Sequence, residues 1–292
     1  MKKSFNTNPV KRLLIPTDFS KDAENAIRFG VQLGRSLKSK ITLYHAVHVP
    51  VLTTAEMALA TPMHDEKEAS YARLNLIKNE LEKEFDYPEI DVLVSTGFAV
   101  DEITKLSQDE KFDLVVMGTR GASGVAELLI GSNTADVIEK CTCPVFAIPS
   151  NARFSQSKKI LFATNYADND FQTLYLLAEM FKSFNPEIVV LHVEAGGDHK
   201  MENRTLEWFK GQVITNIPYN NFSFQTVLAG NVESAVHDFI VEHHVDMLSV
   251  STRKRNFFDT LTSRSLSKKL AYHTEIPLLV FHAHSSSGTP LF

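Results

Sequence analysis

The chain has few cysteines, and their spacing does not favour a bond between them. Only two occur among 292 residues, Cys141 and Cys143. A disulfide between residues two apart would be strained where the chain enters a strand, and a thiolate metal site needs a second pair of ligands that the sequence lacks. We therefore expect two free, buried thiols and no metal centre.

Long apolar runs and excess positive charge are also missing. The apolar run nearest the N-terminus, Leu13 to Pro16, is too short for the core of a signal peptide, and no stretch approaches transmembrane length. The formal net charge is -5, so the chain as a whole does not attract nucleic acid or an anionic membrane. The sequence predicts a cytoplasmic protein with neither a membrane nor a nucleic acid as its partner.

The sequence contains an internal repeat. Residues 160–165 align with residues 13–18, which lie 147 positions earlier, whereas Gly230 aligns with Gly97, which lies 133 positions earlier. The order of the matches, with a single deletion in the second copy, predicts two copies of one fold. The expected parts are a first domain at 1–149, a polar linker at 150–157, a second domain at 158–284 and a polar tail at 285–292.

Strand and helix patterns alternate through the first copy. Apolar runs typical of buried strands cover 13–17, 41–47, 91–95, 114–117 and 145–148, and helical spacing marks 23–37, 74–85, 100–107 and 134–140. This alternation predicts an α/β fold of two tandem Rossmann-like domains, each a five-stranded parallel sheet flanked by about four helices. A ligand is expected at the C-terminal ends of the strands, where Asp18 and Gly118 should meet.

A glycine cluster follows the fourth of these expected strands. Gly118, Gly121 and Gly131 span a loop that leads into a helix starting near Ser132. Glycine admits positive φ and lets a ligand approach the backbone, and a helix N-terminus offers free N–H groups with partial positive charge. The cluster predicts a phosphate cradle; the alternative is that the glycines only shape a loop. It matches neither the P-loop nor the G-x-G-x-x-G pattern.

The cluster resembles the signature of the universal stress protein family. ATP-binding members carry G-x2-G-x9-G-[ST], which this chain fills from Gly118 to Ser132, and the opening strand that leads to Asp18 is also similar. The resemblance implies an adenine-nucleotide-hydrolase-like fold whose two domains pair through their last strands as a pseudo-dimer. It also implies an adenine nucleotide, ATP with or without Mg²⁺, bound by Pro16, Thr17, Asp18, Ala46, Met117, Gly118, Arg120, Gly121, Gly131, Ser132, Asn133 and Thr134.

Several of these residues have a structural alternative. Asp18 could cap the helix that begins near Lys21, because aspartate is a common N-cap. The polar residues 132–134 could equally cap the last helix of the copy. Arg120 could reach a γ-phosphate or be a solvated surface charge.

The second copy does not keep the signature. The alignment places Asn165 at Asp18, Ser251 at Gly118, Lys254 at Gly121 and Arg264 at Gly131, and only Ser265 matches Ser132. Side chains where bare backbone is needed would fill the phosphate space, so this copy is not expected to bind ATP as the first does. Its basic residues either form a pocket for another anion or are a solvated surface.

The lone Trp208 is expected in the core.

Three functions remain open. The first is an ATP-binding regulatory protein of the stress response, which signals through conformational or partner contacts. The second is a slow, Mg²⁺-dependent ATP hydrolase, and the third is a nucleotide-independent scaffold that uses the basic surface of the second copy. Binding is favoured over catalysis, because no Walker lysine or obvious base accompanies the cradle, and no catalytic residue is assigned. A homodimer is expected, and the sequence does not identify a protein partner.

Overall fold

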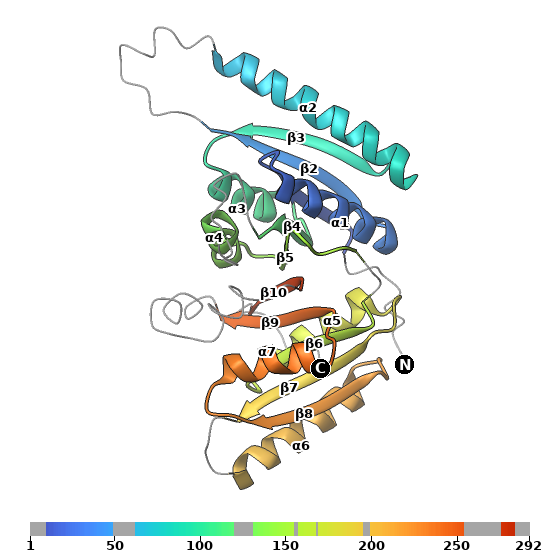
Figure 1. The fold of residues 1–292 in the computed structure, drawn as a ribbon, viewed down its shortest axis with the longest axis vertical. Coiled ribbons are helices and arrows are strands. Elements are labelled where there is room, and N and C mark those ends of the chain that lie inside the picture. The colour runs from blue at the N-terminus through green and yellow to red at the C-terminus, as the bar shows by residue number, and fades with distance from the viewer. Residues whose placement is uncertain are drawn as a thin grey trace, which may run out of the picture. The chain divides into compact units, whose positions relative to one another are not determined.

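The computed structural model describes residues 10–48, 62–119, 131–154, 157–167, 169–194, 199–253 and 276–283. The chain divides into two compact units, Met1–Phe154 and Ser155–Phe292. Strands and helices alternate in both units (Figure 1).

The first unit contains one parallel sheet with helices between its strands. In chain order its elements are β1 (Arg12–Pro16), α1 (Lys21–Leu37), β2 (Lys40–Val47), α2 (Pro62–Phe85), β3 (Ile90–Thr96), α3 (Ala99–Asp109), β4 (Leu114–Gly118), α4 (Ser132–Lys140) and β5 (Val145–Ile148). The strand order is β3-β2-β1-β4-β5, and every neighbouring pair is parallel. The expected five strands and four helices are confirmed.

The second unit repeats this order. Its described elements are β6 (Lys159–Thr164), α5 (Asp170–Phe181), β7 (Glu187–Glu194), α6 (His199–Asn216), β8 (Phe222–Leu228), α7 (Val232–Glu242), β9 (Met247–Arg253) and β10 (Leu278–Ala283). The strand order is β10-β9-β6-β7-β8, again with parallel pairs. The counterpart of α4 would fall between β9 and β10, in a segment outside the described residues.

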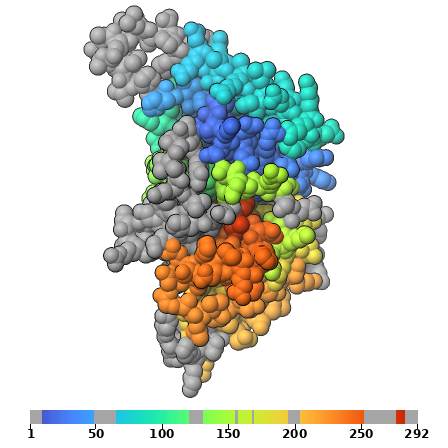
Figure 2. Space-filling view, in the orientation of Figure 1, coloured from blue at the N-terminus to red at the C-terminus, as the bar shows by residue number. Residues whose placement is uncertain are grey.

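Close packing of α1 on the sheet orders the first unit. Its Gly30 and Gly34 face Ile15 of β1 and Ile41 of β2, so the helix backbone approaches both strands closely. Helices α1 and α2 lie side by side on the surface, where they appear in blue and cyan in Figure 2, and an ion pair between Arg28 and Glu84 joins them. One face of this sheet is therefore covered by closely packed helices.

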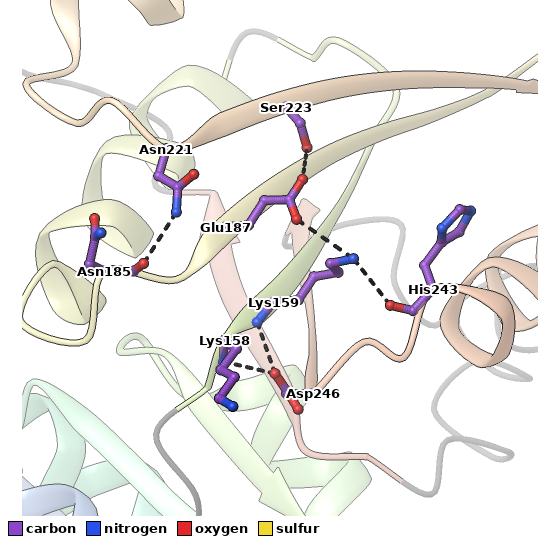
Figure 3. A network of polar contacts seen from close by, with 8 residues as sticks. All are labelled: Lys158, Lys159, Asn185, Glu187, Asn221, Ser223, His243 and Asp246. Atoms are coloured by element: carbon purple, nitrogen blue, oxygen red, sulfur yellow. Dashed lines mark hydrogen bonds and ion pairs between the residues drawn. The ribbon is translucent and has the colours of Figure 1, made fainter.

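An aspartate fixes the start of the first strand in each unit. In the second unit Oδ2 of Asp246 accepts the backbone N–H groups of Lys158 and Lys159, both at 2.8 Å. Figure 3 shows this contact beside the Lys159 side chain, which also reaches Glu187. In the first unit Oδ2 of Asp113 accepts the N–H groups of residues 11 and 12 at 2.8 and 2.9 Å. The internal repeat therefore extends to equivalent hydrogen bonds.

We expect an Asp246→Ala variant to destabilise the second unit by about 2 kcal/mol, because two backbone donors at the start of β6 lose their acceptor. Unfolding by urea, followed through the fluorescence of Trp208, measures the change, since this tryptophan is the only one in the chain and lies in α6. Asp238→Ala is the control, because the Asp238 side chain is 76% exposed on α7. Equal midpoints for the two variants would show that the strand start does not depend on Asp246.

Candidate functional site

The C-terminal ends of β2, β1 and β4 meet at one edge of the first unit's sheet. Strand β1 lies between β2 and β4, and the strand order reverses at this point. Open α/β sheets bind ligands at such a switch point. The edge brings together the predicted site residues that end these strands or follow them, namely Pro16, Thr17, Asp18, Ala46, Met117 and Gly118.

A tight turn follows β1. The N–H of Phe19 donates to Oγ1 of Thr17 at 3.0 Å, and the N–H of Ser20 donates to Oδ1 of Asp18 at 3.0 Å. Ser20 is the N-cap of α1, with its hydroxyl oxygen accepting the N–H of Ala23. The alternative role of Asp18 as the helix cap is therefore wrong: its exposed carboxylate closes the turn before the cap.

An aromatic stack supports this turn from the side of β2. The Phe19 ring lies 4.4 Å from the His45 ring, and Nδ1 of His45 lies 2.8 Å from the carbonyl oxygen of Thr17. Because a carbonyl only accepts, Nδ1 carries the proton in this contact. The guanidinium of Arg73 on α2 lies over the Phe19 ring, 4.2 Å from its centre. Phe19 has φ of 62°, in the left-handed region, and these contacts hold it there.

Sequence reasoning did not identify the members of this stack. The available signal was the repeat, because Tyr166 and His192 stand 147 residues after Phe19 and His45, and they repeat the ring pair and the contact of the histidine with a threonine carbonyl. The Tyr166 and His192 rings are 4.4 Å apart, and Tyr166 has φ of 58°. Equivalent positions that keep both an aromatic ring and a histidine indicate that the turn itself requires them.

A partly buried hydrogen-bond chain lies behind the tip of β2. The Ser95 hydroxyl donates to Oε2 of Glu102 at 2.7 Å, so its oxygen accepts from the Tyr44 hydroxyl at 2.6 Å. Burial raises the pKa of Tyr44 to about 12, so its hydroxyl remains a neutral donor at physiological pH. The chain joins β2, β3 and α3 and fixes the strand that carries Ala46.

Helix α4 begins without a side-chain cap. Its N-cap is Gly131, with φ of -60° and ψ of 153°, and the N–H of Gly131 donates to the carbonyl oxygen of Thr119 at 2.6 Å. Ser132 and Asn133, the first two helical residues, are exposed. The first N–H groups of a helix are unpaired unless capped, and together with the helix dipole they favour an anion. The side chains of residues 132–134 therefore do not cap α4.

Thr134 has a different contact from the one expected. It is buried, and its hydroxyl donates to the carbonyl oxygen of Gly118 at 2.8 Å, which joins the start of α4 to the end of β4. Among the described glycines only Gly97 has a positive φ, so Gly118 and Gly131 are not required for a left-handed backbone. Glycine at both positions leaves the end of β4 and the residue before α4 without a side chain.

Part of the expected cradle lies outside the described residues. This holds for Arg120 and Gly121 in the first unit and for Lys254, Arg264 and Ser265 in the second. The predicted basic pocket of the second copy is therefore known only from sequence.

Other sequence expectations concern metals, thiols and the core. Cys141 and Cys143 are free and buried, as expected. No group of three metal-ligating side chains occurs in the part of the chain that the structure describes. Trp208 is 64% exposed, so its expected place in the core is wrong, and its neighbour Phe209 is buried instead. None of the described helices combines the length and apolar character needed to cross a membrane.

Comparison with known proteins identifies the class of the first unit. Residues 9–149 match the model of the universal stress protein family. Universal stress protein MJ0577 of Methanocaldococcus jannaschii is 29% identical over 155 residues, which cover 47% of this chain and 94% of that protein. Universal stress protein YxiE of Bacillus subtilis is 26% identical over 144 residues, which cover 47% of this chain and 97% of that protein.

The whole chain is similar in fold to a solved universal stress protein from Archaeoglobus fulgidus. That similarity covers 94% of this chain and 97% of the solved one, with a TM-score of 0.68 and 18% identity. The first unit thus matches the universal stress protein family over nearly its whole length, and the two units together have the tandem two-domain fold of that solved protein.

Proposed function

We propose that the first unit binds ATP at the edge where β2, β1 and β4 end. The uncapped start of α4 beside the tip of β4 supports this proposal most strongly, because it leaves helix N–H groups available to an anion. The adenosine part lies against Pro16, Thr17, Asp18 and Ala46, and the phosphates lie against Met117, Gly118, Arg120, Gly121, Gly131, Ser132, Asn133 and Thr134. Mg²⁺, when present, is held mainly by the phosphate oxygens.

The proposed role is regulatory. Occupancy by ATP changes the conformation of the first unit and the contacts of the protein with itself as a homodimer or with a partner protein. Binding is proposed rather than turnover, because the sequence places no Walker lysine beside the cradle.

We expect a Gly131→Arg variant to bind ATP about 100-fold more weakly than the wild type, which corresponds to the loss of one or two hydrogen bonds to a charged phosphate. The arginine fills the space at the start of α4, as Arg264 is expected to do in the second copy. Equilibrium dialysis with labelled ATP measures the affinity. Gly230→Arg is the matched control, because nothing lies within 4 Å of a Cβ placed at Gly230 in the second unit. Equal affinities for the two variants would reject the assigned site.

Bound ATP is expected to stay intact over hours with Mg²⁺. Release of inorganic phosphate from the purified protein tests this, and a rate that the Gly131→Arg variant abolishes would favour the slow hydrolase instead. Mass spectrometry of the ligand released on denaturation tests the scaffold alternative, since a retained adenine nucleotide is incompatible with it.

A further inference from the structure

The two units place one carboxyl group differently at equivalent strand tips. In the first unit it belongs to Asp18, directly after β1, and the residue at position 23 is alanine. In the second unit, 147 residues later, Asn165 replaces Asp18 and Asp170 replaces Ala23. The carboxyl group has therefore moved from the strand tip to the first residue of helix α5.

Asp170 makes contacts with several of the described segments around its strand tip. Its side chain is 3% exposed, and its Oδ2 accepts the Thr164 hydroxyl at 2.6 Å and the N–H of Ala167 at 3.1 Å. The backbone N–H of Asn165 and the side chain of Ser251 also lie near this carboxyl group and favour its charged form. One side chain thus connects the end of β6, the turn that follows it and β9.

The same backbone donor is used in both units, which makes the comparison direct. Ser20 and Ala167 are equivalent, and each gives its N–H to a carboxylate. In the first unit the acceptor is Asp18, which is exposed, whereas in the second it is Asp170, which is buried. The turn keeps its hydrogen bond, but its acceptor moves from the solvent-facing side into the protein.

A second substitution completes the contact in the second unit. Ser251 of β9 stands where the first unit has Gly118, and its hydroxyl oxygen also accepts the side-chain amide of Asn169. In the first unit the tip of β4 has no side chain at Gly118 and faces the start of α4 through its carbonyl oxygen. Serine on one strand tip and aspartate on the neighbouring helix therefore occur together.

We propose that Asp170 is an internal anion that closes the β6–β9 tip of the second unit, and that Ala23 with Gly118 keeps the equivalent tip of the first unit open to a ligand. The carboxyl group takes the polar donors of the tip that a bound anion or ribose would otherwise use. The part that concerns the first unit rests on the proposed ATP site. The part that concerns the second unit stands on the hydrogen bonds of Asp170 alone.

Hydrogen exchange on the full-length chain tests the closure itself. In Asp170→Ala we expect the amides of Asn165 and Ala167 to exchange at least tenfold faster than in the wild type, while amides of β8 keep their rates. Asp238→Ala, which removes an exposed carboxylate of the same unit, should leave all of them unchanged. Asp170→Asn serves if the alanine variant does not fold, since it keeps the volume and weakens the acceptor. Unchanged exchange at Asn165 and Ala167 in a folded variant would overturn the closure.

Placing the equivalent aspartate and serine in the first unit tests whether they weaken the binding of a ligand there. The double variant Ala23→Asp, Gly118→Ser should bind labelled ATP at least tenfold more weakly than the wild type and should slow the amide exchange of Ser20. Ala99→Asp is the control, because it adds a carboxylate to the first residue of another helix, α3, in the same unit. Undiminished ATP affinity in the folded double variant would overturn the proposal. If the wild type binds no ATP, the proposed function fails, and the exchange of Asn165 and Ala167 still decides whether Asp170 closes the second unit.

Discussion

A Gly34→Val variant is expected to lose about 3 kcal/mol of stability in the first unit. A Cβ at this position would lie 2.7 Å from Cδ1 and 2.8 Å from Cγ1 of Ile41, and Cγ1 cannot swing away as a side-chain end can. Helix α1 must therefore move away from β2, whereas Leu13 of β1, at 3.8 Å, would be in ordinary contact with the added Cβ. Denaturant unfolding followed by far-UV circular dichroism measures the loss.

The control for this prediction is the same substitution in a helix that leaves room for it. A Cβ at Gly211 of α6 meets nothing within 4 Å, so Gly211→Val should stabilise the second unit slightly, because glycine is a poor helix former. The fluorescence of Trp208 follows this unit separately. If Gly34→Val proved neutral, α1 would not be packed on β2 as closely as the structure has it.

The sheet was predictable from sequence because parallel strands buried on both faces leave a strong signal. Runs such as 114–117 are apolar at every position, and the structure buries all of them in β4. The alternation of strands and helices then predicted a parallel sheet, and the structure adds the order of its strands. Trp208 shows the limit: it and Phe209 are adjacent on α6, about 100° apart around the helix, and the short apolar pattern did not decide which of them faces the sheet.

The site was predictable only in part, because motifs identify positions and not contacts. The glycine spacing indicated the end of β4 and the start of α4, and these do lie together through Thr134 and Gly118. The sequence placed Thr134 among the residues that bind the nucleotide, whereas in the structure its hydroxyl donates a hydrogen bond to the carbonyl oxygen of Gly118. Asp170 was missed because it lies outside the signature, and only alignment of the helix starts would have shown it against Ala23.

The buried carboxyl group also predicts how the stability of the second unit depends on pH. Burial raises the pKa of Asp170 above its ordinary value, and the hydrogen bonds from Thr164, Ala167, Asn165 and Ser251 offset this only in part. The folded state therefore holds a proton in a pH range where the unfolded chain has released it. Stability from this group is complete below the unfolded value of 3.8 and is lost as pH rises through the raised folded pKa.

We accordingly expect an Asp170→Asn variant to gain stability relative to the wild type as pH rises from about 4 towards 7. The asparagine keeps an acceptor for the N–H of Ala167 but carries no charge, so its own contribution does not change with pH. Urea unfolding at several pH values, followed by Trp208 fluorescence, measures the difference between the two proteins, and Asp238→Asn is the exposed control. A difference that is constant across this range would mean that Asp170 titrates as an ordinary carboxyl group. A difference that grows with pH would mean that the buried carboxyl group of Asp170 lowers the stability of the second unit near neutral pH. This loss of stability is expected if Asp170 closes the strand tip.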